Sequence, residues 1–345
     1  MPIEPFHDFK LIPTVSEILE TAYNRANKKA DAISGKSGAV KLAKAKEIKR
    51  IDVAFEYVME YLDDIVKSVP DLQQLPPFYQ DLAQILVDND QLKQKLGRIS
   101  GNIRVIEKLK HEKVREVIST AAPEQIGLVR KQAFGRMQSV IQRLEPDFAY
   151  LREARKKLKS LPVVNSNVPS VVIAGYPNVG KSSVINNLCG SKLQVAVYPF
   201  TTKRIKVGLY KRGNDMIQFI DTPGVLDRPM PDRNAIELQA ITAMKYIANV
   251  IVFIIDPSQN SGFDLADQLN LLQEVKGLFP DSPIVIMFNK IDVSSPEERQ
   301  TAIDRLHELG EEVQVEYSAM TRDNEDALIA AIKDRIKDFY LKKSD

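Results

Sequence analysis

The eight residues from Gly175 to Ser182, Gly-Tyr-Pro-Asn-Val-Gly-Lys-Ser, constrain the fold of this chain more than any other stretch. They fit the pattern G-x-x-x-x-G-K-[ST] of phosphate-binding loops. An apolar run at residues 171–174 precedes the loop, and residues 183–188 continue with helical spacing. This order turns successive backbone N–H groups and the positive end of a helix dipole toward one volume. The sequence therefore predicts a phosphate site between a buried strand and a helix.

Most positions of this loop have an expected role. Lys181 is expected to reach the β- and γ-phosphates, and the Ser182 hydroxyl is expected to bind Mg²⁺. The other residues expected to line the nucleotide phosphates are Gly175, Pro177, Asn178, Val179, Gly180 and Ser183. The alternative is a glycine turn that binds nothing, which the flanking strand and helix disfavour.

A second motif, Asp221-Thr222-Pro223-Gly224, follows an apolar run about 40 residues after the loop. Asp221 stands where a carboxylate holds Mg²⁺ through a water molecule. Gly224 has no side chain, so its backbone N–H can approach a γ-phosphate closely. Between Lys192 and Arg204, two adjacent threonines, Thr201 and Thr202, stand where a switch loop supplies a hydroxyl to Mg²⁺. Spacing alone does not choose between them, and a plain connecting loop is the alternative.

A third motif, Asn289-Lys290-Ile291-Asp292, selects the base. Asp292 can accept hydrogen bonds from N1–H and N2–H of guanine, whereas adenine has no matching donors there. The Asn289 amide is expected to bond the purine edge and to tie loops together, and the Lys290 stem to lie over the base. The residues expected to offer a backbone N–H to the guanine O6 are Ser318, Ala319 and Met320. The motifs together predict a GTP/GDP site with Mg²⁺.

The pattern of apolar residues changes near residue 165. Before it, apolar residues recur at helical spacing and predict helices over 14–31, 39–68, 76–87, 89–119 and 123–159. After it, strand and helix patterns alternate. The predicted strands are 171–174, 205–210, 216–220, 250–255, 283–288 and 313–317, with a last helix at about 324–340. We predict an α plus α/β chain in two domains: an antiparallel helical bundle (1–164) and a doubly wound, mostly parallel sheet (165–345). Ligands of such sheets bind at the carboxyl ends of the strands, where all three motifs lie.

Charge and cysteine usage add weaker expectations. Residues 1–160 hold 28 of the 48 Lys and Arg residues but 22 of the 46 Asp and Glu residues, so this half is basic. It is the expected nucleic-acid surface, and a solvated helix face is the alternative. A single cysteine, Cys189, fits a reducing cytoplasm. The chain lacks an apolar run near 18 residues, so we expect no membrane span.

The motifs together resemble those of a translation-factor-class GTPase. The loop sequence with Tyr198-Pro-Phe-Thr-Thr202 resembles the Obg clade. Two further features are similar to the Nog family of nucleolar GTP-binding proteins: the basic helical region, and the run Asp256-Pro257-Ser258 through Gly262-Phe263 and Asp267-Gln268. Eukaryotic members carry a long C-terminal tail, so the chain resembles a compact archaeal-type member.

The resemblance implies GTP hydrolysis coupled to assembly of the large ribosomal subunit, with rRNA and ribosomal proteins as partners. It assigns the Mg²⁺-binding switch threonine to Thr202. Val225 replaces the glutamine that orients water in many GTPases, so slow intrinsic hydrolysis is expected. In potassium-activated relatives the asparagine at the position of Asn178 helps to hold K⁺, which implies potassium stimulation here.

Two basic regions are the expected RNA contacts. They comprise Arg25, Lys28, Lys29, Lys36, Lys41, Lys44, Lys46, Lys49 and Arg50, and Arg152, Arg155, Lys156, Lys157 and Lys159. Few aromatic residues interleave with them, which favours structured rRNA gripped by its backbone. An alternative function is a nucleotide-gated scaffold for ribosomal particles with negligible hydrolysis. A P-loop ATPase or a small-molecule kinase is disfavoured by Asp292.

Overall fold

The computed structural model describes residues 4–34, 38–165, 167–190, 193–197, 204–221, 226–229, 233, 235–259 and 261–344. They form two compact units that interleave along the chain. The helical unit contains residues 5–74 and 87–159, and the sheet unit contains residues 1–4, 75–86 and 160–345. The division predicted between residues 164 and 165 lies near the last crossing of the chain from one unit to the other.

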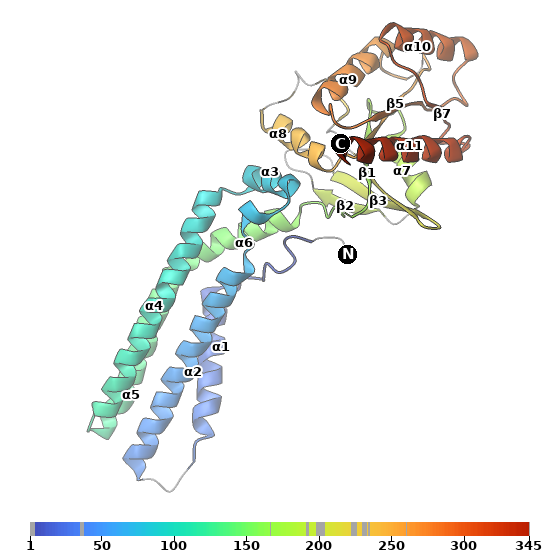
Figure 1. Cartoon of the computed structure of the whole chain (residues 1–345). Helices are drawn as coiled ribbons and strands as arrows, with labels where there is room; N and C mark the ends of the chain where they lie inside the picture. Colours follow the sequence, from blue (N-terminus) through green and yellow to red (C-terminus); the bar gives the residue numbers. More distant parts are fainter. Residues whose placement is uncertain are drawn as a thin grey trace. The chain divides into compact units, whose positions relative to one another are not determined.

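The helical unit is built from long helices with short connections. α1, α2, α4 and α5 lie alongside one another with alternating directions in Figure 1, and α6 follows α5. The bounds are α1 (Val15–Asp31), α2 (Ala39–Ser68), the 3-10 turn η1 (Leu72–Gln74), α4 (Asn89–Ser119), α5 (Pro123–Gln142) and α6 (Glu145–Lys159). The predicted antiparallel bundle is confirmed.

Helix signals in the sequence explain these bounds. α1 begins with a capping box, in which the Thr14 hydroxyl accepts from the Glu17 N–H and the Glu17 carboxylate accepts from the Thr14 N–H. Asp88 caps α4 by accepting from the N–H groups of Asp90 and Gln91. A buried stripe at intervals of three and four runs along α2 and consists of Ile51, Ala54, Phe55, Val58, Leu62 and Ile65.

The single helix predicted over residues 123–159 is wrong. The structure has two helices there, α5 and α6, which are separated by Arg143 and Leu144. Pro146 explains the break. Proline has no N–H to bond the carbonyl of Gln142, and its ring clashes with that carbonyl. Pro146 is instead tolerated in the first turn of α6, where the N–H has no helical partner.

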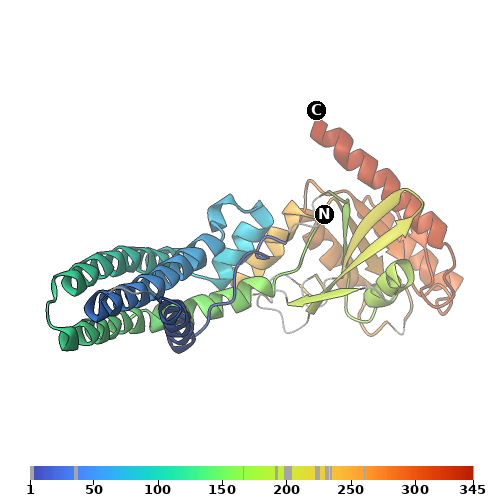
Figure 2. The same ribbon diagram turned by 90° about the horizontal axis from the view of Figure 1, so that it is seen from below.

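The sheet unit contains a seven-stranded sheet in the order β2-β3-β4-β1-β5-β6-β7. β1 pairs in parallel with β4 and β5, and β6 and β7 continue the parallel part. β2 and β3 are antiparallel at one edge. The bounds are β1 (Ser170–Ala174), β2 (Gln194–Val197), β3 (Arg204–Arg212), β4 (Asp215–Asp221), β5 (Val250–Ile255), β6 (Ile284–Phe288) and β7 (Val315–Glu316). The predicted mostly parallel sheet is confirmed, and Figure 2 shows the β3–β4 hairpin in yellow.

Helices cover both faces of this sheet. In Figure 1, α9 and α10 lie on one side of it, and α7 and α11 lie on the other. The helices are α7 (Lys181–Cys189), α8 (Ala235–Ala243), the 3-10 turn η3 (Met244–Tyr246), α9 (Leu265–Leu278), α10 (Pro296–Glu308) and α11 (Glu325–Ser344). β5 is buried at every residue, as a central strand between two helical layers should be. None of the helices in the described part of the chain is long and apolar enough to cross a membrane.

One early helix belongs to the sheet unit. α3 (Pro77–Leu86) packs against α8. Its Tyr79 hydroxyl donates to the carbonyl of Pro162 at 3.0 Å and accepts from the N–H of Val164 at 2.9 Å. Burial raises the pKa of Tyr79 above its usual value. This tyrosine therefore fixes the chain segment that leads into β1.

Candidate nucleotide-binding site

The glycine-rich loop has a backbone that few residue types tolerate. Gly175 and Gly180 have φ values of 133° and 100°, and Asn178 lies in the left-handed region at 66°. A Cβ atom at Gly175 would lie 2.4 Å from the carbonyl oxygen of Ile254. A Cβ atom at Gly180 would lie 2.1 Å from the side-chain nitrogen of Asn289. Both glycines are thus required by close neighbours as well as by their backbone angles.

Lys181 opens α7 and is held across the loop. Its side-chain ammonium donates to the carbonyls of Gly175 and Tyr176, each at 2.6 Å. The residue is only 7% exposed, so these hydrogen bonds compensate for the burial of its charge. The loop and the first turn of α7 border a pocket of about 380 Å³. The residues that line this pocket are Pro177, Asn178, Gly180, Lys181, Ser182, Ser183 and Asp227. An ammonium and a helix N-terminus at one pocket are suited to an anion.

Ser182 and Asp221 lie next to each other, one from α7 and the other at the end of β4. The Ser182 hydroxyl donates to Asp221 Oδ2 at 2.6 Å. Asp221 is fully buried, and its Oδ1 has no hydrogen-bond partner among the described residues. A buried carboxylate oxygen without a partner is costly unless a cation or water occupies the space beside it. The pair therefore fits the oxygen ligands that Mg²⁺ prefers.

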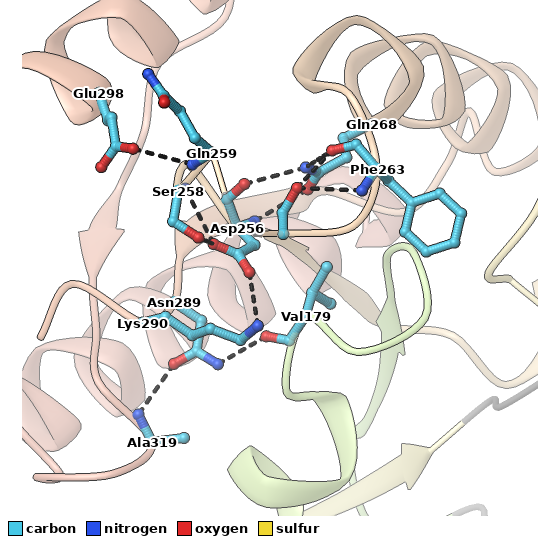
Figure 3. Close-up of polar contacts among 11 residues, drawn as sticks. Val179, Asp256, Ser258, Gln259, Phe263, Gln268, Asn289, Lys290, Glu298 and Ala319 are labelled. Carbon is cyan, nitrogen blue, oxygen red and sulfur yellow. Dashed lines mark hydrogen bonds and ion pairs between the residues drawn. The ribbon is translucent and has the colours of Figure 1, made fainter. Parts of the chain in front are cut away.

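Asn289 joins three segments that are distant in sequence. It follows β6 and is 1% exposed. Its amide nitrogen donates to the carbonyl of Val179 in the phosphate loop at 2.7 Å, and its amide oxygen accepts from the N–H of Ala319 at 2.9 Å. Figure 3 shows both hydrogen bonds. The side chain therefore links the phosphate loop directly to the loop after β7.

Asp292 is exposed, and its orientation is set by a buried serine. The Ser318 hydroxyl donates to Asp292 Oδ1 at 2.6 Å and accepts from the N–H groups of Met320 and Thr321, each at 3.2 Å. The Met320 side chain itself is 86% exposed. Of the candidate O6 donors, the Ala319 N–H is engaged within the chain at 2.9 Å and the Met320 N–H at 3.2 Å.

Asn187 and Tyr317 also hold the loop after β7 in place. Asn187, on α7, donates to the Ala319 carbonyl at 2.7 Å and to the Tyr317 hydroxyl at 3.2 Å. Tyr317 is fully buried, and burial raises the pKa of its hydroxyl. The helix that follows the phosphate loop therefore also fixes the loop after β7.

Lys290 has a partner that the sequence motifs do not reveal. Its ammonium lies 2.6 Å from Asp256 Oδ2, and Asp256 is 1% exposed at the end of β5. The Lys290 backbone has a φ of 64°, in the left-handed region. The signal available in the sequence was an aspartate placed directly after a strand of six apolar residues.

Of the other predicted site residues, the structure describes Asn178 but not the two threonines of the switch loop or the residues at 224 and 225. Asn178 is exposed and lines the pocket. Thr201, Thr202, Gly224 and Val225 lie outside the described residues, so their expected roles stay predictions.

Family models match both units. The model of the NOG1 N-terminal helical domain matches residues 6–165. The model of nucleolar GTP-binding protein 1 (NOG1) matches residues 235–292. An archaeal protein of Methanocaldococcus jannaschii, itself uncharacterized, is 40% identical over 293 residues, which are 84% of this chain and 82% of that protein. The chain belongs to the NOG1 family.

The eukaryotic relatives are longer than this chain. The nucleolar GTP-binding protein 1 of Caenorhabditis elegans is 29% identical over 340 residues, which are 97% of this chain and 49% of that protein. The chain spans about half the length of the curated eukaryotic NOG1 proteins it matches. A crystal structure assigned to nucleolar GTP-binding protein 1 of Plasmodium falciparum is 33% identical and covers 53% of this chain and 93% of its own, with a TM-score of 0.46.

The Asn289 link in this NOG1-family protein can be tested without any ligand. Asn289→Ala leaves the buried Val179 carbonyl and the half-buried Ala319 N–H unpaired, which should lower the free energy of unfolding by about 2–4 kcal/mol. Urea denaturation measures this loss. Asn102→Ala is the matched control, because its exposed amide donates to the Arg98 carbonyl one turn earlier in the same helix; we expect a loss under about 0.5 kcal/mol. Equal losses in the two variants would contradict the role of Asn289.

Proposed function

We propose that the chain is a Mg²⁺-dependent GTPase that binds GTP and GDP and hydrolyses GTP to GDP and phosphate. The observation that carries the proposal is the Asn289 link, because it holds the phosphate loop beside the loop that contains Ser318. Asp292, oriented by Ser318, would then accept the two N–H donors of guanine while the phosphates lie at the N-terminus of α7.

The phosphate end of the site supports hydrolysis through charge. Lys181 would place its ammonium on the β- and γ-phosphates. Ser182 and Asp221 would hold Mg²⁺, directly and through water respectively, and the ion would neutralise charge that develops on the phosphates. Thr202 and the Gly224 N–H, both assigned from the sequence, would complete the site when the γ-phosphate is present. Such a site works by positioning and charge, which is sufficient for phosphoryl transfer.

The base assignment is tested at Asp292. Asp292→Asn replaces one acceptor by a donor, so we expect GDP affinity to fall by roughly 10²–10³-fold. Affinity for xanthosine diphosphate should rise, since its C2 carbonyl can accept from the new amide. Nucleotide titration measures both. The control is Asp323→Asn, at an exposed carboxylate that accepts from Thr321 on the neighbouring loop. Unchanged guanine selectivity in the Asp292 variant would refute the assignment.

We propose slow intrinsic hydrolysis with stimulation by K⁺. Val225 cannot orient a water molecule with its side chain. Asn178 lines the phosphate pocket and has a left-handed backbone, and an amide oxygen is a suitable ligand for a monovalent cation. We expect single-turnover hydrolysis to be roughly tenfold faster in K⁺ than in Na⁺, and the difference to disappear in Asn178→Ala, because a cation there takes part of an arginine finger's role. Equal rates of the unaltered protein in both salts would contradict this.

We also propose that the helical unit binds rRNA and that the protein acts as a nucleotide switch in large-subunit assembly, in the cytoplasm. Some of its basic residues already bond carbonyls or carboxylates of the chain itself. Lys44 donates to the Ile118 carbonyl, and Arg50 pairs with Asp31 and Glu47. In the second region, Arg152, Arg155 and Lys159 donate to the carbonyls of Pro13, Phe9 and His7 and so hold the N-terminal segment.

The end of α2 is the better candidate surface. Residues 39–50 contain no buried residue, and the buried stripe of this helix begins at Ile51. Asp31, the last residue of α1, pairs with Arg50, so the first turns of α2 extend beyond the end of α1. Lys41, Lys46 and Lys49 lie on this extension, which we call the α2 extension.

Substituting Lys41, Lys46 and Lys49 together by Gln should weaken binding to large-subunit rRNA. The slope of log affinity against log salt should flatten by roughly 2–3, because up to three phosphate contacts are lost. Filter binding at several salt concentrations measures it. The control replaces three lysines already paired with carboxylates, Lys10, Lys67 and Lys337. Equal slopes for the two variants would contradict this surface.

One observation favours the alternative of a nucleotide-gated scaffold with negligible hydrolysis. Val225 stands where many GTPases have the glutamine that orients the attacking water. The scaffold alternative predicts that purified large subunits do not raise kcat and that GTP and GDP forms bind ribosomal particles equally. Stimulated hydrolysis together with nucleotide-dependent sedimentation would support the switch.

A further inference from the structure

The Asp256 carboxylate is buried and fully engaged. Its Oδ2 lies 2.6 Å from the ammonium of Lys290. Its Oδ1 accepts from the N–H of Ser258 at 3.0 Å and from the hydroxyl of Ser258 at 2.7 Å. A carboxylate that is 1% exposed would be strongly destabilising without such partners. Figure 3 shows it at the centre of a polar network.

A buried glutamine fixes the backbone of the same aspartate. Gln268, on α9 and 1% exposed, accepts from the Asp256 N–H at 3.0 Å and donates to the Asp256 carbonyl at 3.0 Å. Its amide also donates to the carbonyl of Phe263 at 3.3 Å. Both the main chain and the side chain of Asp256 are therefore held in place independently of Lys290.

The segment between these two residues also touches the phosphate loop. The ring of Phe263 packs on the ring of Tyr176, with centroids 4.6 Å apart. The Gln259 N–H donates to Glu298 at the start of α10. Residues 256–259 and 261–268 are thus anchored to α10, to the phosphate loop and to the lysine of the base motif.

We propose that Asp256 is a positioning residue for nucleotide binding: it fixes the Lys290 ammonium beside the base site, so that the lysine stem lies over the face of the purine. The inference rests on the proposed GTP site and adds the group that orients its lysine. The left-handed backbone of Lys290 directs this side chain toward β5. The Asp256 carboxylate then fixes the position of the Lys290 ammonium. The lysine methylenes then offer an apolar face to the base, and the Lys290 ammonium beside the base is already paired with Asp256.

A purely structural ion pair is the competing explanation. Buried ion pairs contribute little net stability compared with apolar residues of similar volume. The two explanations make different predictions, because a positioning residue acts on nucleotide affinity only through Lys290. A structural residue acts on folding, and its effect on affinity is independent of Lys290.

A double-mutant cycle on the full chain tests the proposal. GDP affinity is measured by displacement of a fluorescent GDP analogue for Asp256→Asn, Lys290→Met and the double variant. We expect each single substitution to weaken GDP binding by roughly tenfold, and the double variant to be no weaker than the weaker single one. Losses that multiply in the double variant would overturn the proposal, as would an Asp256→Asn variant with unchanged affinity.

The matched control is Asp147→Asn in the helical unit. Asp147 is also fully buried, and it lies 3.1 Å from the ammonium of Lys95. We expect this variant to be less stable in thermal unfolding but to keep its GDP affinity. An equal loss of GDP affinity in the control would mean that reduced stability alone explains the Asp256 result.

Base chemistry separates failure of this inference from failure of the proposed function. The lysine stem covers any purine, so Asp256→Asn should weaken GDP and IDP by the same factor. Asp292→Asn should change the ratio of the two, because inosine lacks the 2-amino group. If that ratio does not change, the GTP site itself is wrong; if it changes while the Asp256 and Lys290 losses multiply, only the positioning role is wrong.

A second cycle keeps the test decisive if Asp256→Asn does not fold. Gln268→Met removes the clamp on the Asp256 backbone and keeps the size of the side chain. It should weaken GDP binding severalfold when Lys290 is present and have no effect when Lys290 is Met. An equal effect in both backgrounds would overturn the proposal.

Discussion

The candidate site depends on one buried amide. Asn289 uses its nitrogen on the phosphate loop and its oxygen on the loop after β7, so two loops that are 140 residues apart in sequence have a common anchor. Gly180 lies so close beneath this amide that any side chain there would displace it. Because unpaired buried amide groups are costly, the Asn289 anchor stabilises both loops. The fold therefore holds the phosphate loop beside the loop after β7.

Three carboxylates lie at or after the ends of β4, β5 and β6, and their surroundings give them different chemistry. Asp221, the last residue of β4, is buried with one oxygen unpartnered among the described residues, which suits a cation. Asp256 after β5 is buried with both oxygens engaged, which suits a structural hold on a lysine. Asp292, just after β6, is exposed and oriented by Ser318, which suits a ligand. Burial and partners, rather than residue type, decide what each carboxylate can do.

The sequence predicted the bundle, the mostly parallel sheet and the position of the phosphate loop, because apolar periodicity and glycine spacing report local structure directly. It missed what depends on partners distant in sequence. β2 is a short edge strand whose exposed Gln194 and Val195 show no buried alternation. The helical pattern of α3 is the same whether it joins the bundle or packs on α8. Asp256 is one aspartate after an apolar strand, and only the fold brings Lys290 to it.

The same limit applies to charge in the helical unit. Composition counts Arg155 and Lys41 equally as basic residues, yet Arg155 holds the carbonyl of Phe9 while Lys41 lies on a helix extension without a buried face. A guanidinium that satisfies a backbone carbonyl loses that hydrogen bond if it turns to a phosphate, so its net contribution to RNA binding is small. The positive charge that remains available is therefore more localised than the sequence suggests. An RNA bound only at the α2 extension would have few of its phosphates contacted, so its recognition would depend on the shape of the folded RNA rather than on overall charge.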